Sequence, residues 1–95
     1  MNKDINTATN NICYETKFED GTEITDYLAV GVAEGFETTE GTTDQMRAWS
    51  YICGKQLYKG LQGFFGRQVN DLIENGVLAI NGDVDWSEYD NLIQG

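Results

Sequence analysis

Residues 43–75, TDQMRAWSYICGKQLYKGLQGFFGRQVNDLIEN, contain the two longest helical patterns of the chain. In the first part of this stretch, apolar residues recur every three or four positions, as on one face of a helix: Met46, Trp49, Ile52, Cys53 and Leu57. Thr42 and Gln45 have the spacing of a capping box, which predicts that the helix begins there. Gly54 interrupts the pattern at a cost of up to about 1 kcal/mol relative to alanine. We therefore expect another segment of backbone to contact Gly54.

A glycine-rich turn, KGLQGFFGR (residues 59–67), separates this pattern from a second one. The second pattern predicts a helix whose apolar side carries Phe65, Val69, Leu72 and Ile73. Asn75-Gly76 predicts its end, because glycine readily adopts the left-handed conformation that follows many helices. The glycines of the turn lack the spacing of a phosphate-binding loop and follow no strand, so we expect them to allow close packing. The stretch predicts a helix–turn–helix core over residues 43–75.

Two segments outside this core have strand patterns. Residues 12–18 alternate apolar with polar side chains, and the tight-turn sequence Asp20-Gly21 follows them. In residues 77–86, Asn81-Gly82 separates two short apolar-containing runs, which is typical of a β-hairpin. The predicted fold class is α+β: one small domain with a helix–turn–helix core, a short β-hairpin over 77–86 and an N-terminal strand element.

The remaining segments are less distinctive. Residues 22–32 are compatible with a strand that pairs with 12–18 or with a short helix capped by Thr25, and the four-residue spacing of Ile24, Leu28 and Val32 favours the helix. Ser87 is expected to cap a last helical stretch. We expect residues 1–11 to be flexible and residues 34–42 to form an internal linker. Residues 1–95 are too few for a second domain.

The chain is strongly acidic, with six Lys and Arg against sixteen Asp and Glu and a net charge of −10. This charge disfavours non-specific binding to nucleic acid and to anionic membranes. It is compatible with solubility alone, with a basic protein partner, or with mimicry of the charge of DNA. The first residues, MNKDINTATNN, lack the apolar stretch of a signal peptide, and no apolar run has the length of a transmembrane helix.

Catalytic chemistry finds little support in the composition. The chain has no histidine, and neither Cys13 nor Cys53 has an evident activating partner, so we expect no enzyme activity and no cofactor. The two cysteines lack a CxxC spacing, which favours buried, reduced thiols in a cytosolic protein. Asp83, Asp85 and Ser87 alternate as at the start of a calcium loop, but the glycine and glutamate required later in that loop are absent. We expect no metal site.

The positive charge is concentrated in the core. Residues 45–70 contain no Asp or Glu and carry +4, which leaves −14 on the rest of the chain. These cations can lie over apolar surface and pair with carboxylates of neighbouring segments, such as Asp71, Glu74 or those of 83–90. Alternatively, they form a docking face for an acidic partner or a second copy of the chain. The candidate interface residues are Lys55, Lys59, Gln62, Phe64, Arg67, Asp83, Asp85 and Glu88.

A helix–turn–helix followed by a hairpin also has the outline of a winged-helix DNA-binding protein. The second helix offers Arg67, Gln68 and Asn70 to base edges. Carboxylates on that helix and on the hairpin would repel the phosphate backbone, so this hypothesis ranks last.

Residues 48–78, AWSYICGKQLYKGLQGFFGRQVNDLIENGVL, resemble small proteins of tailed bacteriophages that share a helix with an aromatic residue, then LQG, an aromatic residue and GR. The matching residues are Trp49, Leu61, Gln62, Gly63, Phe65, Gly66, Arg67, Leu72, Ile73 and Gly76. Val69 departs from the pattern, since those proteins usually have a small residue there. The resemblance implies a phage source, a helical hairpin and candidate roles for Gln62 and Arg67, but no reaction.

These observations lead to one leading hypothesis and two alternatives. The leading hypothesis is a small acidic phage accessory protein in the host cytoplasm that binds, and so modulates, a basic nucleic-acid-handling host protein. The first alternative is a minor virion or self-assembling structural protein. The second is a winged-helix-like DNA-binding regulator.

Overall fold

The computed structural model describes residues 12–94, so the expected flexibility of residues 1–11 lies outside the described residues. The elements in chain order are α2 (Asp26–Glu34), α3 (Asp44–Gly54), the 3-10 helix η1 (Leu57–Gly60), α4 (Gly63–Glu74) and α5 (Trp86–Gln94). None of these helices combines the length and the apolar character needed to cross a lipid bilayer.

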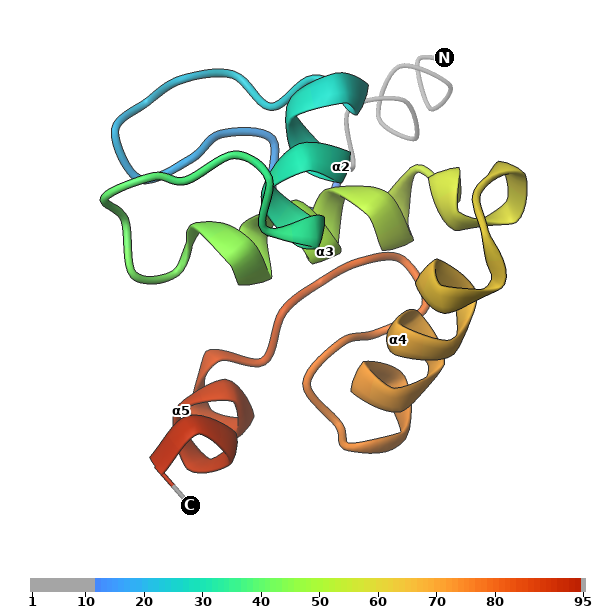
Figure 1. Ribbon diagram of the computed structural model, residues 1–95. Coiled ribbons are helices and arrows are strands. Elements are labelled where there is room, and N and C mark those ends of the chain that lie inside the picture. Colours follow the sequence, from blue (N-terminus) through green and yellow to red (C-terminus); the bar gives the residue numbers. More distant parts are fainter. Residues whose placement is uncertain (1–11, 95) are drawn as a thin grey trace, which may run out of the picture.

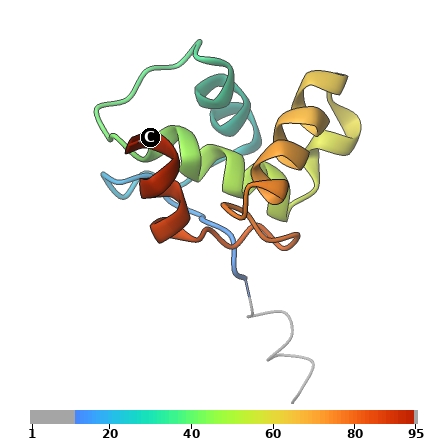
Figure 2. The same cartoon turned by 90° about the horizontal axis from the view of Figure 1, so that it is seen from below.

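Helix α3 is the central element. Helix α2 packs along one side of α3, whereas α4 and α5 lie near its opposite ends (Figures 1 and 2). The loop of residues 77–85 leaves α4, crosses α3 and leads into α5, as Figure 1 shows in orange. This arrangement places the core around α3.

The apolar pattern that predicted α3 corresponds to the core. Met46, Trp49, Ile52 and Cys53 are buried, whereas Leu57 is half-buried in η1. The buried part of α3 is nevertheless wider than a single face, because four further residues of the helix are buried as well: Asp44, Ala48, Ser50 and Tyr51. These positions are covered because α2 packs on one side of α3 and the 77–85 loop on another.

The prediction of a second helix is confirmed. Helix α4 buries Phe65, Val69 and Leu72 and leaves Ile73 half-buried. The ring of Phe65 lies 5.7 Å from that of Trp49 on α3, which joins the two helices of the predicted core. After α4, Gly76 adopts a φ of +80°, the left-handed conformation expected there.

The predicted α+β fold class is wrong, because residues 12–94 contain neither a strand nor a sheet. The predicted N-terminal strand makes one isolated antiparallel bridge, between Lys17 and Glu23, and the predicted hairpin makes one between Leu78 and Val84. Both turns do form, with φ of +90° at Gly21 and +91° at Gly82.

Helix capping explains why neither turn extends into a ladder. After the first turn, Thr25 accepts a hydrogen bond from the Leu28 N–H and caps α2, which confirms the short helix favoured for residues 22–32. After the second turn, the Asp85 carboxylate accepts a hydrogen bond from the Glu88 N–H at 3.1 Å and starts α5. In each case the would-be second strand becomes a helix within a few residues.

Two predicted helix starts are also wrong. Ser87 was expected to cap the last helix, but Ser87 lies inside α5, and the Asp85 carboxylate accepts the hydrogen bond from the Glu88 N–H. The capping box of Thr42 and Gln45 is absent, and α3 follows Thr43. The Thr43 hydroxyl donates to the Glu19 carboxylate, so it contributes to tertiary structure and not to a cap.

Gly54 contacts another backbone, as its position in the helical pattern predicted. The 77–85 loop crosses α3 at this point, and a Cβ built at Gly82 would lie 2.9 Å from the Gly54 Cα. The Ser50 hydroxyl donates to the Gly82 carbonyl and accepts from the Glu15 N–H, so one side chain fixes both crossing segments. The absence of a side chain at Gly82 allows the loop to lie directly on the helix, and its absence at Gly54 leaves room for the Tyr14 side chain.

The two cysteines lie in different environments. Cys53 is buried and Cys13 is exposed, and both are free thiols, so the expected burial of Cys13 is wrong. Cys13 is exposed near the start of the part of the chain that the structure describes.

The predicted linker joins two helices of one packed unit. Residues 35–43 connect α2 with α3, and these two helices pack against each other.

Candidate protein-interaction surface

The cations of the predicted basic face have different partners. Arg47 forms an ion pair with Glu15 at 2.6 Å and stacks on the Trp86 ring at 5.3 Å. Lys55 forms an ion pair with Asp26 at 3.2 Å and lies over the Tyr51 ring. Arg47 therefore faces the N-terminal segment and α5, whereas Lys55 faces α2.

Lys59 and Arg67 are exposed and form no ion pair with a described residue. Arg67 shares an open hollow on α4 with Phe64, whose ring is 45% exposed and packs edge-on against Trp49. Gln62 precedes α4, is exposed and makes no capping bond. Phe64 and Arg67 are thus the candidate interface residues that the structure brings together, but Asp71 and Glu74 line the same hollow.

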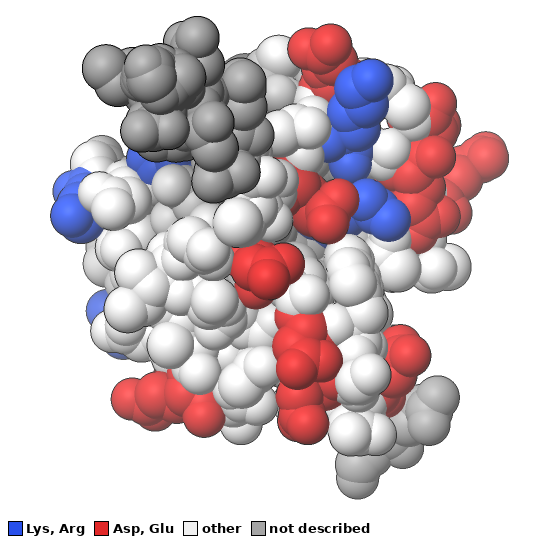
Figure 3. Space-filling view, turned by 180° about the vertical axis from the view of Figure 1, so that it is seen from behind, with Lys and Arg blue, Asp and Glu red and all other residues white. Residues whose placement is uncertain are grey.

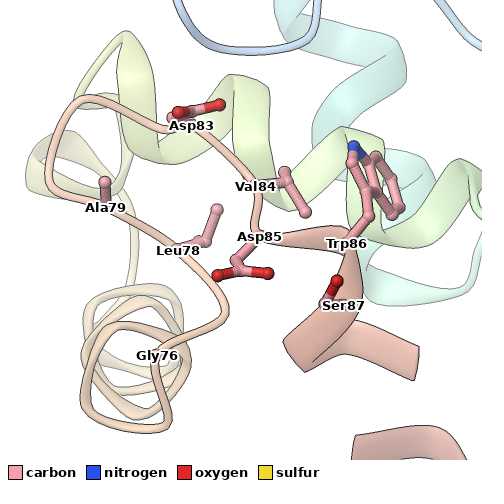
Figure 4. Close-up of a pocket in the computed structure, with 8 residues that line it drawn as sticks. All are labelled: Gly76, Leu78, Ala79, Asp83, Val84, Asp85, Trp86 and Ser87. Carbon is pink, nitrogen blue, oxygen red and sulfur yellow. The ribbon is translucent and has the colours of Figure 1, made fainter. Parts of the chain in front are cut away.

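The acidic candidates lie around a second hollow, between the 77–85 loop and the start of α5. Asp83, Asp85 and Trp86 line it together with Leu78 (Figure 4). Its volume is about 490 Å³. The Asp85 carboxylate is engaged as the cap of α5, and Glu88 follows in the first turn of that helix. No group of acidic or sulfur side chains within residues 12–94 is arranged to hold a metal ion.

The outer face of α2 presents a surface that the sequence did not predict. Tyr27 is 75% exposed and Phe36, just after the helix, is 82% exposed. These aromatic residues and Val30 line an open groove of about 500 Å³, whose remaining lining residues are Gly31, Asp26, Glu34 and Glu37. We call these seven residues the α2 surface.

Phe36 is held in place although its ring is uncovered. Helix α2 ends in a Schellman motif, in which the Phe36 N–H donates to the Gly31 carbonyl at 2.9 Å and the Gly35 N–H to the Val32 carbonyl at 3.1 Å. In such a motif the residue at the position of Phe36 commonly packs on the side chain at the position of Gly31. Glycine offers no side chain there, and the stem of Glu37 occupies the space, since a Cβ at Gly31 would lie 2.7 Å from the Glu37 Cγ.

Asp26 connects the α2 surface to the core. Its carboxylate accepts hydrogen bonds from the Tyr51 hydroxyl at 2.7 Å and from the Lys55 ammonium at 3.2 Å. The bond from Tyr51, followed by that from Lys55, lowers the pKa of Asp26 below its usual range, whereas burial raises the pKa of Tyr51. Asp26 therefore stays ionised and fixed at the edge of the groove.

A feature of the sequence would have indicated the α2 surface. The helix DYLAVGVAE is apolar on nearly all sides, yet only Ala29, Val32 and Ala33 are buried in it. Because the helix buries one side against α3, Tyr27 on another side stays exposed and Val30 is half-buried. The exposure of Phe36 could not be inferred from the sequence.

The surroundings of the α2 surface are strongly acidic. Nine carboxylates and a single lysine lie between residues 15 and 44. Of the carboxylates in residues 12–94, Asp44 alone is buried, so the others contribute charge to the surface. On the face shown in Figure 3, acidic groups gather at the upper right and in the lower part, and basic groups lie among the acidic ones at the upper right and at the left edge.

Comparisons with known proteins add nothing to this geometry: no family model matches the chain, and no curated protein or solved structure matches it. The similarity of residues 48–78 to phage proteins stays a prediction.

Proposed function

We propose that this protein is an acidic binding module that attaches to a basic surface of another protein and performs no catalysis of its own. The observation that carries the proposal is the excess of surface carboxylates over lysines between residues 15 and 44. Such a surface raises the association rate with a positively charged partner and repels anionic ones. Proteins that handle nucleic acids present the required basic surface.

The partners of the cations in the predicted basic face favour binding to a basic protein over binding to an acidic one. Arg47 and Lys55 are already paired with carboxylates of the same chain, so two of the four core cations are not available to an acidic partner. The second helix of the core, α4, carries Asp71 and Glu74 beside Arg67, which opposes an approach to DNA. The resemblance of residues 48–78 to phage proteins supports a host protein as the partner.

The test is capture of partners by the immobilised chain from lysate at about 50 mM salt, followed by elution at about 500 mM salt, where electrostatic attraction is screened. Basic nucleic-acid-binding proteins are expected in the eluate. A variant that removes four exposed charges should lose them: Glu23→Gln, Glu34→Gln, Glu37→Gln and Glu40→Gln. The matched control, Asp71→Asn with Glu74→Gln on α4, should retain them.

Two results would contradict the proposal. One is the absence of any protein that elutes with salt. The other is equal capture by the four-charge variant and the native chain, which would show that the carboxylates between residues 15 and 44 have no part in binding.

A further inference from the structure

We infer that the α2 surface is the docking site for a partner segment that carries an apolar anchor flanked by Lys or Arg. This inference rests on the proposed function and specifies where the contact is made and what chemistry it selects. The occupant is a basic, amphipathic segment of another protein.

The apolar part of the argument concerns Tyr27 and Phe36. These are the two most exposed aromatic side chains in residues 12–94, and both line one groove with Val30. Tyrosine and phenylalanine bury large areas when they are covered, and residues of this kind dominate the energetics of protein interfaces. Their proximity on one surface marks a place where an apolar group gains by binding.

The rigidity of the site adds to this argument. Phe36 is fixed by the Schellman motif and Tyr27 projects from a regular helix, so neither backbone needs to be ordered on binding. A preorganised surface loses less conformational entropy when a partner docks. The exposed ring of Phe36 is consequently not the result of a loose loop, and at Gly31 there is no side chain for it to pack on because the stem of Glu37 occupies that space.

The carboxylates that line the groove indicate which kind of partner binds there. Asp26, Glu34 and Glu37 line the groove around the aromatic side chains, and neither glutamate forms an ion pair with a described residue. Lysine or arginine on each side of the anchor would pair with these carboxylates. A second copy of the chain that docked face to face would oppose the same three carboxylates to themselves, which is repulsive. An anionic lipid surface is repelled for the same reason.

Binding of synthetic peptides to the full chain tests the inference. The probe is a 14-residue amphipathic helix of leucine and lysine, and the first control replaces each leucine by serine at the same charge. We expect the leucine–lysine peptide to shift the backbone amide NMR signals of residues 26–37. The serine–lysine peptide should bind at least about tenfold more weakly, since loss of an apolar anchor typically has at least this effect.

Variants of the protein locate the contact. Tyr27→Ala with Phe36→Ala should weaken binding of the leucine–lysine peptide at least about tenfold. Both side chains are largely exposed, so circular dichroism and the melting temperature should stay close to those of the native chain. Ile80→Ala is the matched control, because Ile80 is equally exposed at 75% but lies in the 77–85 loop, and it should bind the peptide as the native chain does.

The outcomes separate this inference from the proposed function. If the serine–lysine peptide binds equally well and its shifts are spread over the acidic surface, the inferred site is wrong and the proposed function survives. If neither basic peptide binds, both are wrong. If light scattering shows a dimer that the double variant abolishes, the occupant is a second copy and the inference is overturned.

Discussion

Gly82 determines how closely the 77–85 loop approaches α3 at Gly54, whereas Gly54 itself leaves room for the Tyr14 side chain. A Cβ at Gly82 would lie 2.6 Å from the Tyr14 Cβ and 2.7 Å from the Ser50 carbonyl oxygen, and the residue also has a φ of +91°. Both the crowding and the left-handed backbone are unfavourable for any other residue.

We predict that Gly82→Ala lowers the free energy of unfolding by about 3 kcal/mol, as the sum of overpacking and backbone strain. Urea denaturation followed by circular dichroism measures the change. Gly60→Ala is the control, since no atom lies within 4 Å of a Cβ at that position and its φ is not positive. That variant should differ from the native protein by less than about 0.5 kcal/mol. Equal stability of the two variants would show that the loop does not lie on α3.

The second prediction at this scale concerns the charge on Asp26. Because the hydrogen bonds from Tyr51 and Lys55 lower its pKa in the folded protein, the carboxylate stabilises the fold at pH values above its unfolded pKa, about 3.9. That contribution is lost as the pH falls through the lower folded pKa.

Asp26→Asn should therefore be less stable than the native chain at pH 7, and the difference should shrink as the pH falls below about 4. Urea unfolding at several pH values gives the comparison. A difference that stays constant over this range would mean that ionisation of the Asp26 carboxyl group contributes nothing to stability.

At the scale of the elements, the starts of helices α2 and α5 explain why the protein is helical and not α+β. The turn sequences Asp20-Gly21 and Asn81-Gly82 predicted the turns correctly, because their backbone requirements are local. Strand pairing depends on the residues after each turn, and there Thr25 and Asp85 start helices. The sequence contained both capping residues, but Ser87 was predicted as the cap of the last helix, and only the folded geometry identifies Asp85.

The role of Asp85 gives the prediction for helix α5. Asp85→Ala should lower the free energy of unfolding by about 1 kcal/mol, because it removes the acceptor for the Glu88 N–H. Ser87→Ala should have an effect close to zero, since the Ser87 side chain is exposed inside the helix. Thermal unfolding of both variants provides the measurement, and a larger effect at Ser87 would restore the assignment made from the sequence.

The helices of the core were predictable for a different reason. Periodicity reports which positions are buried, and in α3 and α4 it identified Trp49, Cys53, Phe65 and Val69 correctly. The α2 surface was not predictable in the same way. Tyr27 and Phe36 are apolar like their buried neighbours, and their exposure results from the side of α2 that faces α3 and from the missing side chain at Gly31.

For the whole molecule, the net charge of −10 on a small fold is a source of instability as well as of binding. Salt screens this repulsion. It also weakens the two ion pairs found within residues 12–94, but these are partly exposed and contribute little. We predict that raising sodium chloride from about 20 to about 500 mM increases the urea midpoint. The variant with four charges removed should respond less, and a decrease in the midpoint would show that specific ion pairs outweigh the general repulsion.

The different environments of the two thiols make this molecule easy to label. Cys53 lies beneath the 77–85 loop with its sulfur 3.5 Å from the Ala79 carbonyl oxygen, and burial raises its pKa, whereas Cys13 is exposed. Maleimide reagents, which need an accessible thiolate, should attach a fluorophore to Cys13 alone in the native protein. The slow appearance of a second labelled site would then time the lifting of the loop from α3.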